Sequence, residues 1–378
     1  MKDFLVEDIK LNSFFTKIVY LDEAFVVNVP EMPFFKSLAK TLAKWDFKVV
    51  YSDGEAHKEY IEESIEVSSD GIMSLSAQSD ADKIKKSEEF LSSFQYFVDN
   101  LFIRFRVSDE LEFKNVAEQI KSVVDFVRDD RRFLMRVLKS MEPAPEKNYL
   151  ASHSVRSTIL AIIIGSYLKL PNHRLIELGI AALLHEVGML KLPPEIYLSK
   201  KTLGEREQKA IVSHPVLGYS ILKSFDFPLA ISLAALEHHE RESGSGYPRH
   251  LASEKISLYS KIIAVACSYE ALSSRRPHKE AKDGYTGMLE LLKNEGKQYN
   301  DTVVRALVLS LSIYPIGLYV LLSNGKKGQV VDVNPENPRF PIVQIFGEIT
   351  PDGRTRTEQT SANGLTITRP LNRSEIES

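Results

Sequence analysis

Cysteine is almost absent from this sequence of 378 residues, since Cys267 is its single thiol. One thiol cannot form a disulfide within the chain, which excludes the disulfide-rich secreted scaffolds and fits a reducing compartment. Long apolar runs are also missing, because the most apolar stretch, 159–165, is far too short to cross a bilayer. Segment 1–8 lacks the basic start and the apolar run of a signal peptide. We therefore expect a cytoplasmic protein with no membrane partner.

An excess of positive charge is missing as well. Lysine and arginine number 48 against 51 acidic residues, which gives a formal net charge of −3. Nucleic-acid polymers are bound by basic surfaces, so the bulk charge predicts no nucleic-acid partner. The apolar share of 43% is ordinary for a globular protein, and the length suffices for two or three domains with at least one large core.

The first 66 residues (1–66) have the pattern of a small α/β domain. Segments 25–29 and 47–51 are predicted strands, and the apolar spacing over 34–45 predicts a helix between them. This part carries no catalytic motif, and we interpret it as a sensory or docking module for a signalling protein partner. Segment 67–86 is rich in Ser, Asp and Lys, which predicts a linker.

The remaining chain is mainly α. Over 87–314 apolar residues recur at helical spacing without intervening strands, which predicts a helical bundle. Segment 315–349 predicts a short β extension, with a hairpin around Asn324-Gly325 and a third strand over 341–346. Residues 350–378 are predicted to form a polar, disordered tail. The expected fold is thus a helical bundle with a small N-terminal α/β domain and a short C-terminal β segment.

Five of the nine histidines lie on or beside the apolar side of a predicted helix. They are His153, His185, His214, His238 and His239. Any one of them alone would be interpreted as a core residue with a satisfied imidazole. Five from four helices, with Glu186 beside His185, favour a metal site, because imidazole and carboxylate are ligands of borderline metal ions. Two ions about 3.5–4 Å apart would hold a hydroxide and screen the charge of a phosphodiester.

The motifs around these histidines follow a specific order. His185-Glu186-Val187-Gly188-Met189 is similar to the His-Asp-x-Gly-Lys motif, and His238-His239-Glu240-Arg241 is followed by Gly244-Ser245-Gly246-Tyr247-Pro248. Tyr269-Glu270-Ala271-Leu272 and Arg276-Pro277 come next. This series, from about 115 to 346, resembles the HD-GYP family, which are metal-dependent phosphohydrolases of the HD superfamily that act on cyclic di-GMP.

The resemblance implies an HD-type helical bundle that hydrolyses cyclic di-GMP or a related nucleotide in bacterial second-messenger signalling. It implies two transition-metal ions, with iron or manganese expected first and zinc as a further option, and it allows a homodimer. The implied metal ligands are His153, His185, Glu186, His214, His238, His239 and Cys267. The implied catalytic residues are His185 and Glu186. The implied substrate-binding residues are Lys200, Arg241, Gly246, Tyr247, Pro248 and Arg276.

Five positions depart from the family pattern. Glu186 stands in place of Asp and moves the carboxylate oxygens by about one bond length. Met189 replaces a lysine and can donate neither a proton nor a positive charge. Cys267 replaces a later Asp ligand; its thiolate can bind zinc or iron, and the alternative is a small buried apolar residue. Tyr149 stands where three-metal members carry Glu, and Ser243 replaces an Asp before the glycine loop.

Three functions remain open at this point. The first is a phosphodiesterase that acts on cyclic di-GMP, which the histidines, Arg276 and the loop favour. The second is a catalytically degenerate signalling module that binds metal, nucleotide or a partner protein, which the changes at Glu186, Met189 and Cys267 favour. The third is another HD-type nucleotide phosphohydrolase, and a panel of substrates separates all three.

Overall fold

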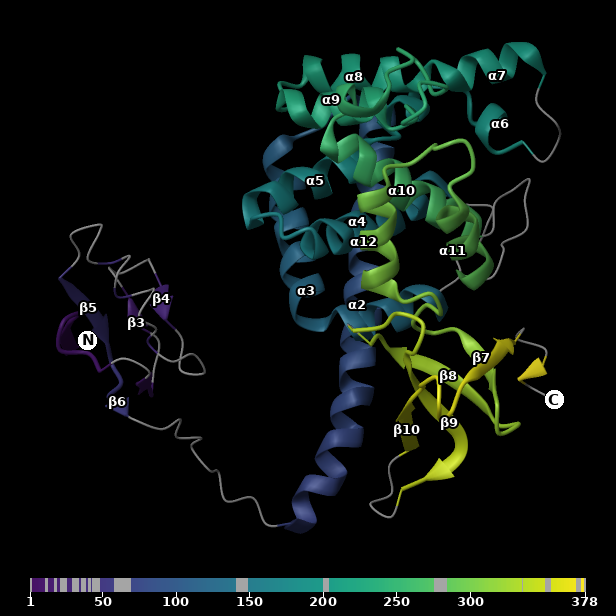
Figure 1. The fold of residues 1–378 in the computed structure, drawn as a ribbon. Coiled ribbons are helices and arrows are strands. Elements are labelled where there is room, and N and C mark those ends of the chain that lie inside the picture. The colour runs from purple at the N-terminus through teal and green to yellow at the C-terminus, as the bar shows by residue number, and fades with distance from the viewer. Residues whose placement is uncertain are drawn as a thin grey trace. The chain divides into compact units, whose positions relative to one another are not determined.

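The computed structural model divides the chain into two compact units, Met1–Ile72 and Met73–Ser378, which we describe separately (Figure 1). It describes residues 2–10, 13–16, 19–20, 26–28, 34, 39, 42, 48–57, 69–140, 149–199, 204–274, 284–334, 336–350, 355–371 and 375–376. Within these ranges, no helix combines the length and apolar character that a membrane span requires.

The N-terminal unit contains short antiparallel strands. One sheet has the order β1 (Lys2–Leu5), β5 (Val49–Ser52), β3 (Val19–Tyr20) and β4 (Val26–Asn28), and a second pairs β2 (Phe14–Phe15) with β6 (Ala56–His57). Its buried core includes Phe15, Phe34 and Val50. Strands β4 and β5 coincide with the two segments predicted to be strands. Most of the helix predicted over 34–45 lies outside the described residues.

The second unit is a helical bundle, which confirms the predicted mainly α class. Its helices are α2 (Ser69–Ser108), α3 (Phe113–Ser140), α4 (Tyr149–Tyr167), α5 (Asn172–Leu184), η1 (Val187–Lys191), α6 (Pro194–Tyr197), α7 (Glu205–Val212), α8 (His214–Ser224), α9 (Leu229–Glu237), η2 (Ser253–Lys255), α10 (Leu258–Ser273), α11 (Gly284–Lys293) and α12 (Asp301–Leu311). Helix α4 is almost entirely buried because it packs against α3, α5, α10 and α12. Its apolar residues therefore surround the helix instead of forming one stripe.

Helix α2 replaces the linker that the sequence predicts over 67–86, since the chain is helical from Ser69 onward. Five of the six side chains in 81–86 are exposed, and Ile84 is the half-buried exception. Over 81–86, the polar composition that indicated a linker is therefore that of a solvated helix surface. Further along α2, Leu91, Phe94 and Val98 enter the core of the bundle.

The C-terminal segment forms one antiparallel sheet with the order β10-β9-β8-β7-β11. Its strands are β7 (Tyr319–Leu322), β8 (Lys327–Asp332), β9 (Ile342–Ile349), β10 (Thr355–Gln359) and β11 (Ile367–Pro370). The predicted hairpin and third strand correspond to β7, β8 and β9. The tail predicted to be disordered from residue 350 instead supplies β10 and β11 at the two edges. Edge strands are held by backbone pairing and need few apolar side chains, so their polar composition concealed them.

Candidate metal centre

Three of the histidines stand where a helix ends. His185 follows α5, His214 begins α8 just after the end of α7, and His238 follows α9. The Nδ1–H of each imidazole donates a hydrogen bond to a carbonyl three residues earlier. The accepting oxygens lie 2.6–2.8 Å away in Ala182, Ile211 and Ala235. The last turn of a helix leaves carbonyls without intrahelical partners, so each histidine both caps its helix and fixes the direction of its own ring.

These bonds leave the Nε2 lone pairs facing one another. The Nε2 atoms of His214 and His238 are 3.1 Å apart, and those of His185 and His153 are 3.3 Å apart. In the His214–His238 pair both Nδ1 protons are donated to carbonyls, so the two Nε2 atoms of neutral rings cannot share a hydrogen bond and a cation between them would satisfy both lone pairs. Nitrogens about 2.0–2.1 Å from one metal ion would stand about 3–3.4 Å from each other, so the observed spacing fits shared metal ligation.

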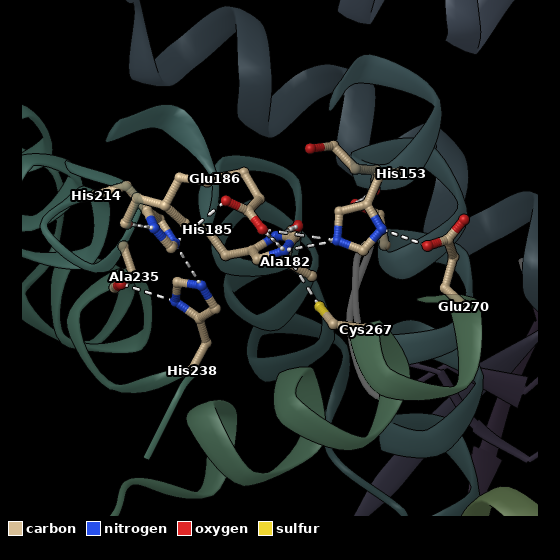
Figure 2. A network of polar contacts seen from close by, with 12 residues as sticks. His153, Ala182, His185, Glu186, His214, Ala235, His238, Cys267 and Glu270 are labelled. Carbon is tan, nitrogen blue, oxygen red and sulfur yellow. Dashed lines mark hydrogen bonds and ion pairs between the residues drawn. The ribbon is translucent and has the colours of Figure 1, made fainter. Parts of the chain in front are cut away.

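His153 is oriented by a buried carboxylate that the sequence did not identify as part of the site. Its Nδ1 contacts Oε2 of Glu270, one turn beyond Cys267 on α10 (Figure 2). Burial lowers the pKa of His153, but Glu270 and Cys267 outweigh it and raise the pKa to about 10. The imidazole therefore keeps a proton until a cation takes its place, as expected when metal binding releases protons.

The ligand atoms form two neighbouring groups. One contains Glu186, His214, His238 and His239, and the other contains His153, His185 and Cys267; within each group the ligand atoms lie no more than 4.8 Å apart. All five imidazoles predicted to be metal ligands are therefore gathered here, together with the predicted carboxylate and thiol.

Glu186 lies between the two groups (Figure 2). Its Oε2 is 3.2 Å from Nε2 of His214, and its Oε1 is 3.7 Å from Nε2 of His185 and 3.8 Å from that of His153. Buried Oε2 has no hydrogen-bond donor among the described residues. Burial raises the pKa of Glu186, but the surrounding histidines outweigh it and lower the pKa to about 2. An ionised, unpaired oxygen in this position fits a metal ligand.

Cys267 extends from α10 toward His185, and its Sγ is 3.2 Å from Nε2 of that histidine. Burial raises the pKa of the thiol, but the charges of His185 and His153 and their hydrogen bonds outweigh it and lower the pKa to about 6. The sulfur is thus disposed to be a thiolate, which is the form that binds metals. This environment differs from the apolar surroundings of a cysteine that only fills space.

The glycine loop, residues 244–248, lies against His239. The ring of Tyr247 stacks on that of His239 at a centroid distance of 4.6 Å and an interplanar angle of 15°. A Cβ on Gly246 would stand 2.5 Å from backbone atoms of residues 239–241, so only glycine fits there. The carboxylate of Glu240 accepts hydrogen bonds from the backbone N–H groups of Arg249 and Leu251, at 2.7 and 2.9 Å. The loop is therefore fastened directly beside the metal ligands.

The remaining predicted substrate residues have different positions. Arg241 donates from its guanidinium to the carbonyls of His238 and Glu240 and lies 5.2 Å from the ring centroid of Tyr299. These contacts make Arg241 a support for the histidine pair. Pro248 is half-buried in the loop. Lys200 and Arg276 lie outside the described residues.

Close helix packing places Glu186 opposite His214. A Cβ on Gly188 would stand 2.0 Å from the carbonyl oxygen of His214, so the glycine lets η1 approach the start of α8. Met189, the residue in the lysine position of the motif, is buried in η1. Met189 therefore supplies no positive charge to the candidate metal centre.

Comparisons with known proteins relate the chain to HD-domain proteins. The sequence profile described as HD domain matches residues 137–303. The chain is 31% identical to "Cyclic di-GMP phosphodiesterase PdeB" of Borreliella burgdorferi, over 62% of this chain and 63% of that protein. It is 27% identical to "Cyclic di-GMP phosphodiesterase PA4108" of Pseudomonas aeruginosa, over 70% of this chain and 63% of that protein. The chain thus spans 63% of the length of each of these two relatives.

One solved structure has the same fold. It is "Bd1817, a HDG"Y"P protein from Bdellovibrio bacteriovorus", with a TM-score of 0.50 and 13% sequence identity. The similarity covers 81% of this chain and 97% of that chain. At this level of identity the comparison concerns the fold alone.

Proposed function

Because residues 137–303 match the HD domain profile, we propose that this chain belongs to the HD-GYP family and is a metal-dependent phosphodiesterase that hydrolyses cyclic di-GMP in bacterial second-messenger signalling. The observation that carries the proposal is the meeting of five imidazoles, one carboxylate and one thiol in the core of the bundle. The names of the two relatives support cyclic di-GMP as the substrate.

Two transition-metal ions would be held by the two ligand groups, with iron, manganese or zinc compatible with imidazole ligands. When bound, they would lower the pKa of a water molecule and offset the negative charge of a phosphodiester. His185 and Glu186 are the proposed catalytic pair: the histidine belongs to one group, and the carboxylate turns one oxygen toward each.

Substrate positioning is proposed for the loop and for two cations. Tyr247, stacked on His239, covers one side of the ligand group and limits the access of water. Gly246 and Pro248 hold the loop that carries it. Lys200 and Arg276 are proposed to contact the phosphates, because a guanidinium binds phosphate oxygens through directed, charge-assisted hydrogen bonds.

The altered residues favour slow turnover in this proposal. Met189 supplies no cation to the departing oxygen, so we expect hydrolysis to be slow or confined to one of the two phosphodiester bonds. If turnover is absent, the same fold serves as a nucleotide-binding or protein-interaction module. This second function is favoured by the three substitutions Glu186, Met189 and Cys267.

Calorimetry and product chromatography on one metal-loaded preparation separate these functions. Binding of cyclic di-GMP followed by a linear product supports the phosphodiesterase, and binding without product supports the nucleotide module. Absence of binding in the presence of metal contradicts both and leaves a protein-interaction module. A panel of other cyclic and linear nucleotides identifies a different HD-type phosphohydrolase.

A homodimer is proposed on the basis of α2. Tyr96, Ile103 and Val107 are 72%, 55% and 82% exposed and follow one another at intervals of seven and four residues. This is the spacing of a helix–helix seam, and a second copy of the same stripe covers it. In a parallel pair, Asp99 of one helix would face Arg104 of the other, since charges five residues apart meet across such a seam.

The Met1–Ile72 unit is proposed as the sensory or docking part.

A further inference from the structure

We propose that the two ligand groups are metal subsites of unlike hardness. The group of His153, His185 and Cys267, here called the thiolate subsite, would select a thiophilic ion such as zinc. The group of Glu186, His214, His238 and His239, here called the carboxylate subsite, would accept a harder ion such as manganese or iron. The inference rests on the proposed metal-dependent function and adds a preference that the function itself does not require.

The thiolate subsite is built by three separate elements. His153 comes from α4, His185 from the end of α5 and Cys267 from α10. The Nε2 atom of His185 lies 3.3 Å from that of His153 and 3.2 Å from the sulfur of Cys267. Both imidazoles are held through Nδ1, by Ala182 and by Glu270, so their Nε2 atoms and the sulfur face one region.

The donor set of this subsite is two nitrogens and one sulfur. Zinc centres with three protein ligands and an open position use such combinations, and a thiolate favours zinc over manganese or magnesium. Of the two nearest carboxylates, one is engaged elsewhere and the other is shared with the carboxylate subsite. Glu270 is engaged with Nδ1 of His153, on the opposite side of the ring, and Glu186 keeps its closest contact with His214.

The carboxylate subsite has a different composition. It offers three imidazole nitrogens and a carboxylate oxygen, and no sulfur ligand is present in this group. Imidazole and carboxylate suit iron, manganese and zinc alike, so the ion held there depends on supply. The contrast between the groups comes from Cys267, because the other ligands of the thiolate subsite are imidazoles too.

A neutral thiol offers a competing explanation of the same geometry. At 3.2 Å the S–H group of Cys267 could donate a hydrogen bond to Nε2 of His185 without any metal. A bound ion and a hydrogen-bonded thiol predict different spectra, and this difference provides the test.

The test uses the full chain, stripped of metal and reloaded with cobalt(II) without oxygen. Wild type should bind two ions and show a near-ultraviolet sulfur-to-cobalt charge-transfer band. Cys267→Ser and Cys267→Asp should lose the band, and Cys267→Asp should retain two ions because it supplies a carboxylate. His239→Ala is the matched control: it should weaken the carboxylate subsite and retain the band.

Metal competition gives a second readout. With zinc and manganese supplied together, wild type should take zinc at the thiolate subsite. Cys267→Asp should lower the zinc-to-manganese ratio of the bound ions by about tenfold, since even outer-sphere partners of a metal contribute about 10–100-fold to affinity. An unchanged ratio overturns the proposed preference.

The outcomes for the inference and for the proposed activity are separable. Absence of the charge-transfer band from wild type with two cobalt ions bound, or failure to bind cobalt, overturns the inference. That result needs no variant, so a misfolded mutant cannot obscure it. Hydrolysis of cyclic di-GMP without the band contradicts only the inference. The band without hydrolysis contradicts only the proposed activity.

Discussion

Individual imidazole protons determine what the centre can bind. His185, His214 and His238 each keep Nδ1–H on a helix carbonyl, which leaves Nε2 as a ligand atom. The sequence was sufficient to propose all five histidines, because their helical positions and their order are local features. It could not identify Glu270, whose role depends on a contact with His153, 117 positions away.

At the same scale, Glu270→Gln should weaken metal binding. The substitution removes the negative charge that supports His153 as a ligand, and such outer partners are worth about 10–100-fold in metal affinity. Chelator competition on the full chain measures the change. Glu254→Gln, at an exposed position in η2, is the matched control and should leave affinity unchanged. Equal affinity of the two variants would contradict the role given to Glu270.

Met189→Lys should raise turnover of cyclic di-GMP by about tenfold or more, because a preorganised cation stabilises charge that develops in the transition state. Met189→Leu preserves the apolar character of this buried position and should leave turnover unchanged. Steady-state rates at equal metal content give the comparison. A lysine variant with normal metal content and unaltered or slower turnover would count against this explanation of slow hydrolysis.

At the scale of elements, helix ends and one loop assemble the site. Apolar periodicity predicted the helices of the bundle well, because burial of one face leaves a repeating pattern in the sequence. Polar composition gave a wrong prediction at the start of α2, which is helical from Ser69. It was also wrong for β10 and β11, which are held by backbone pairing. The contact of the glycine loop with residues 239–241 is likewise tertiary and has no periodic signal.

Gly246→Ala should displace this loop. Its new Cβ would stand 2.5 Å from three backbone atoms of residues 239–241, none of which can move alone. We expect a loss of about 1–3 kcal/mol in the free energy of unfolding and a fall in turnover. Gly204→Ala is the control, since its nearest neighbour would be the end of the Glu207 side chain at 3.7 Å. Denaturant unfolding of both variants decides whether Gly246 is specifically required.

The exposed stripe on α2 makes a second prediction at this scale. Ile103→Asp should convert a dimer into a monomer, because a carboxylate would be buried against its own copy in the seam. Sedimentation measures the mass of each species. Glu88→Lys, on an exposed α2 position outside the stripe, should leave the dimer intact. A monomeric wild type, or a dimer that survives Ile103→Asp, would show that α2 pairs differently.

At the scale of the whole molecule, the chain combines a small β-containing unit with a helical unit that gathers the candidate metal ligands. The sequence predicted the mainly α class and, through ordered motifs, a resemblance to the HD-GYP family. The spatial separation of the ligands into two groups could not be predicted, because it depends on how α4, α5, α8, α9 and α10 pack.

Metal-dependent hydrolysis of cyclic di-GMP is the central proposal for this chain. The most direct measurement is chromatography of the products formed by one preparation of the full chain, metal-loaded, metal-stripped and then reloaded. The loaded sample should form a linear product, the stripped sample should form none, and reloading should restore it. The double variant His238→Ala, His239→Ala should form no product. Persistent absence of product from protein shown to hold two metal ions, or equal product with and without metal, would contradict this proposal.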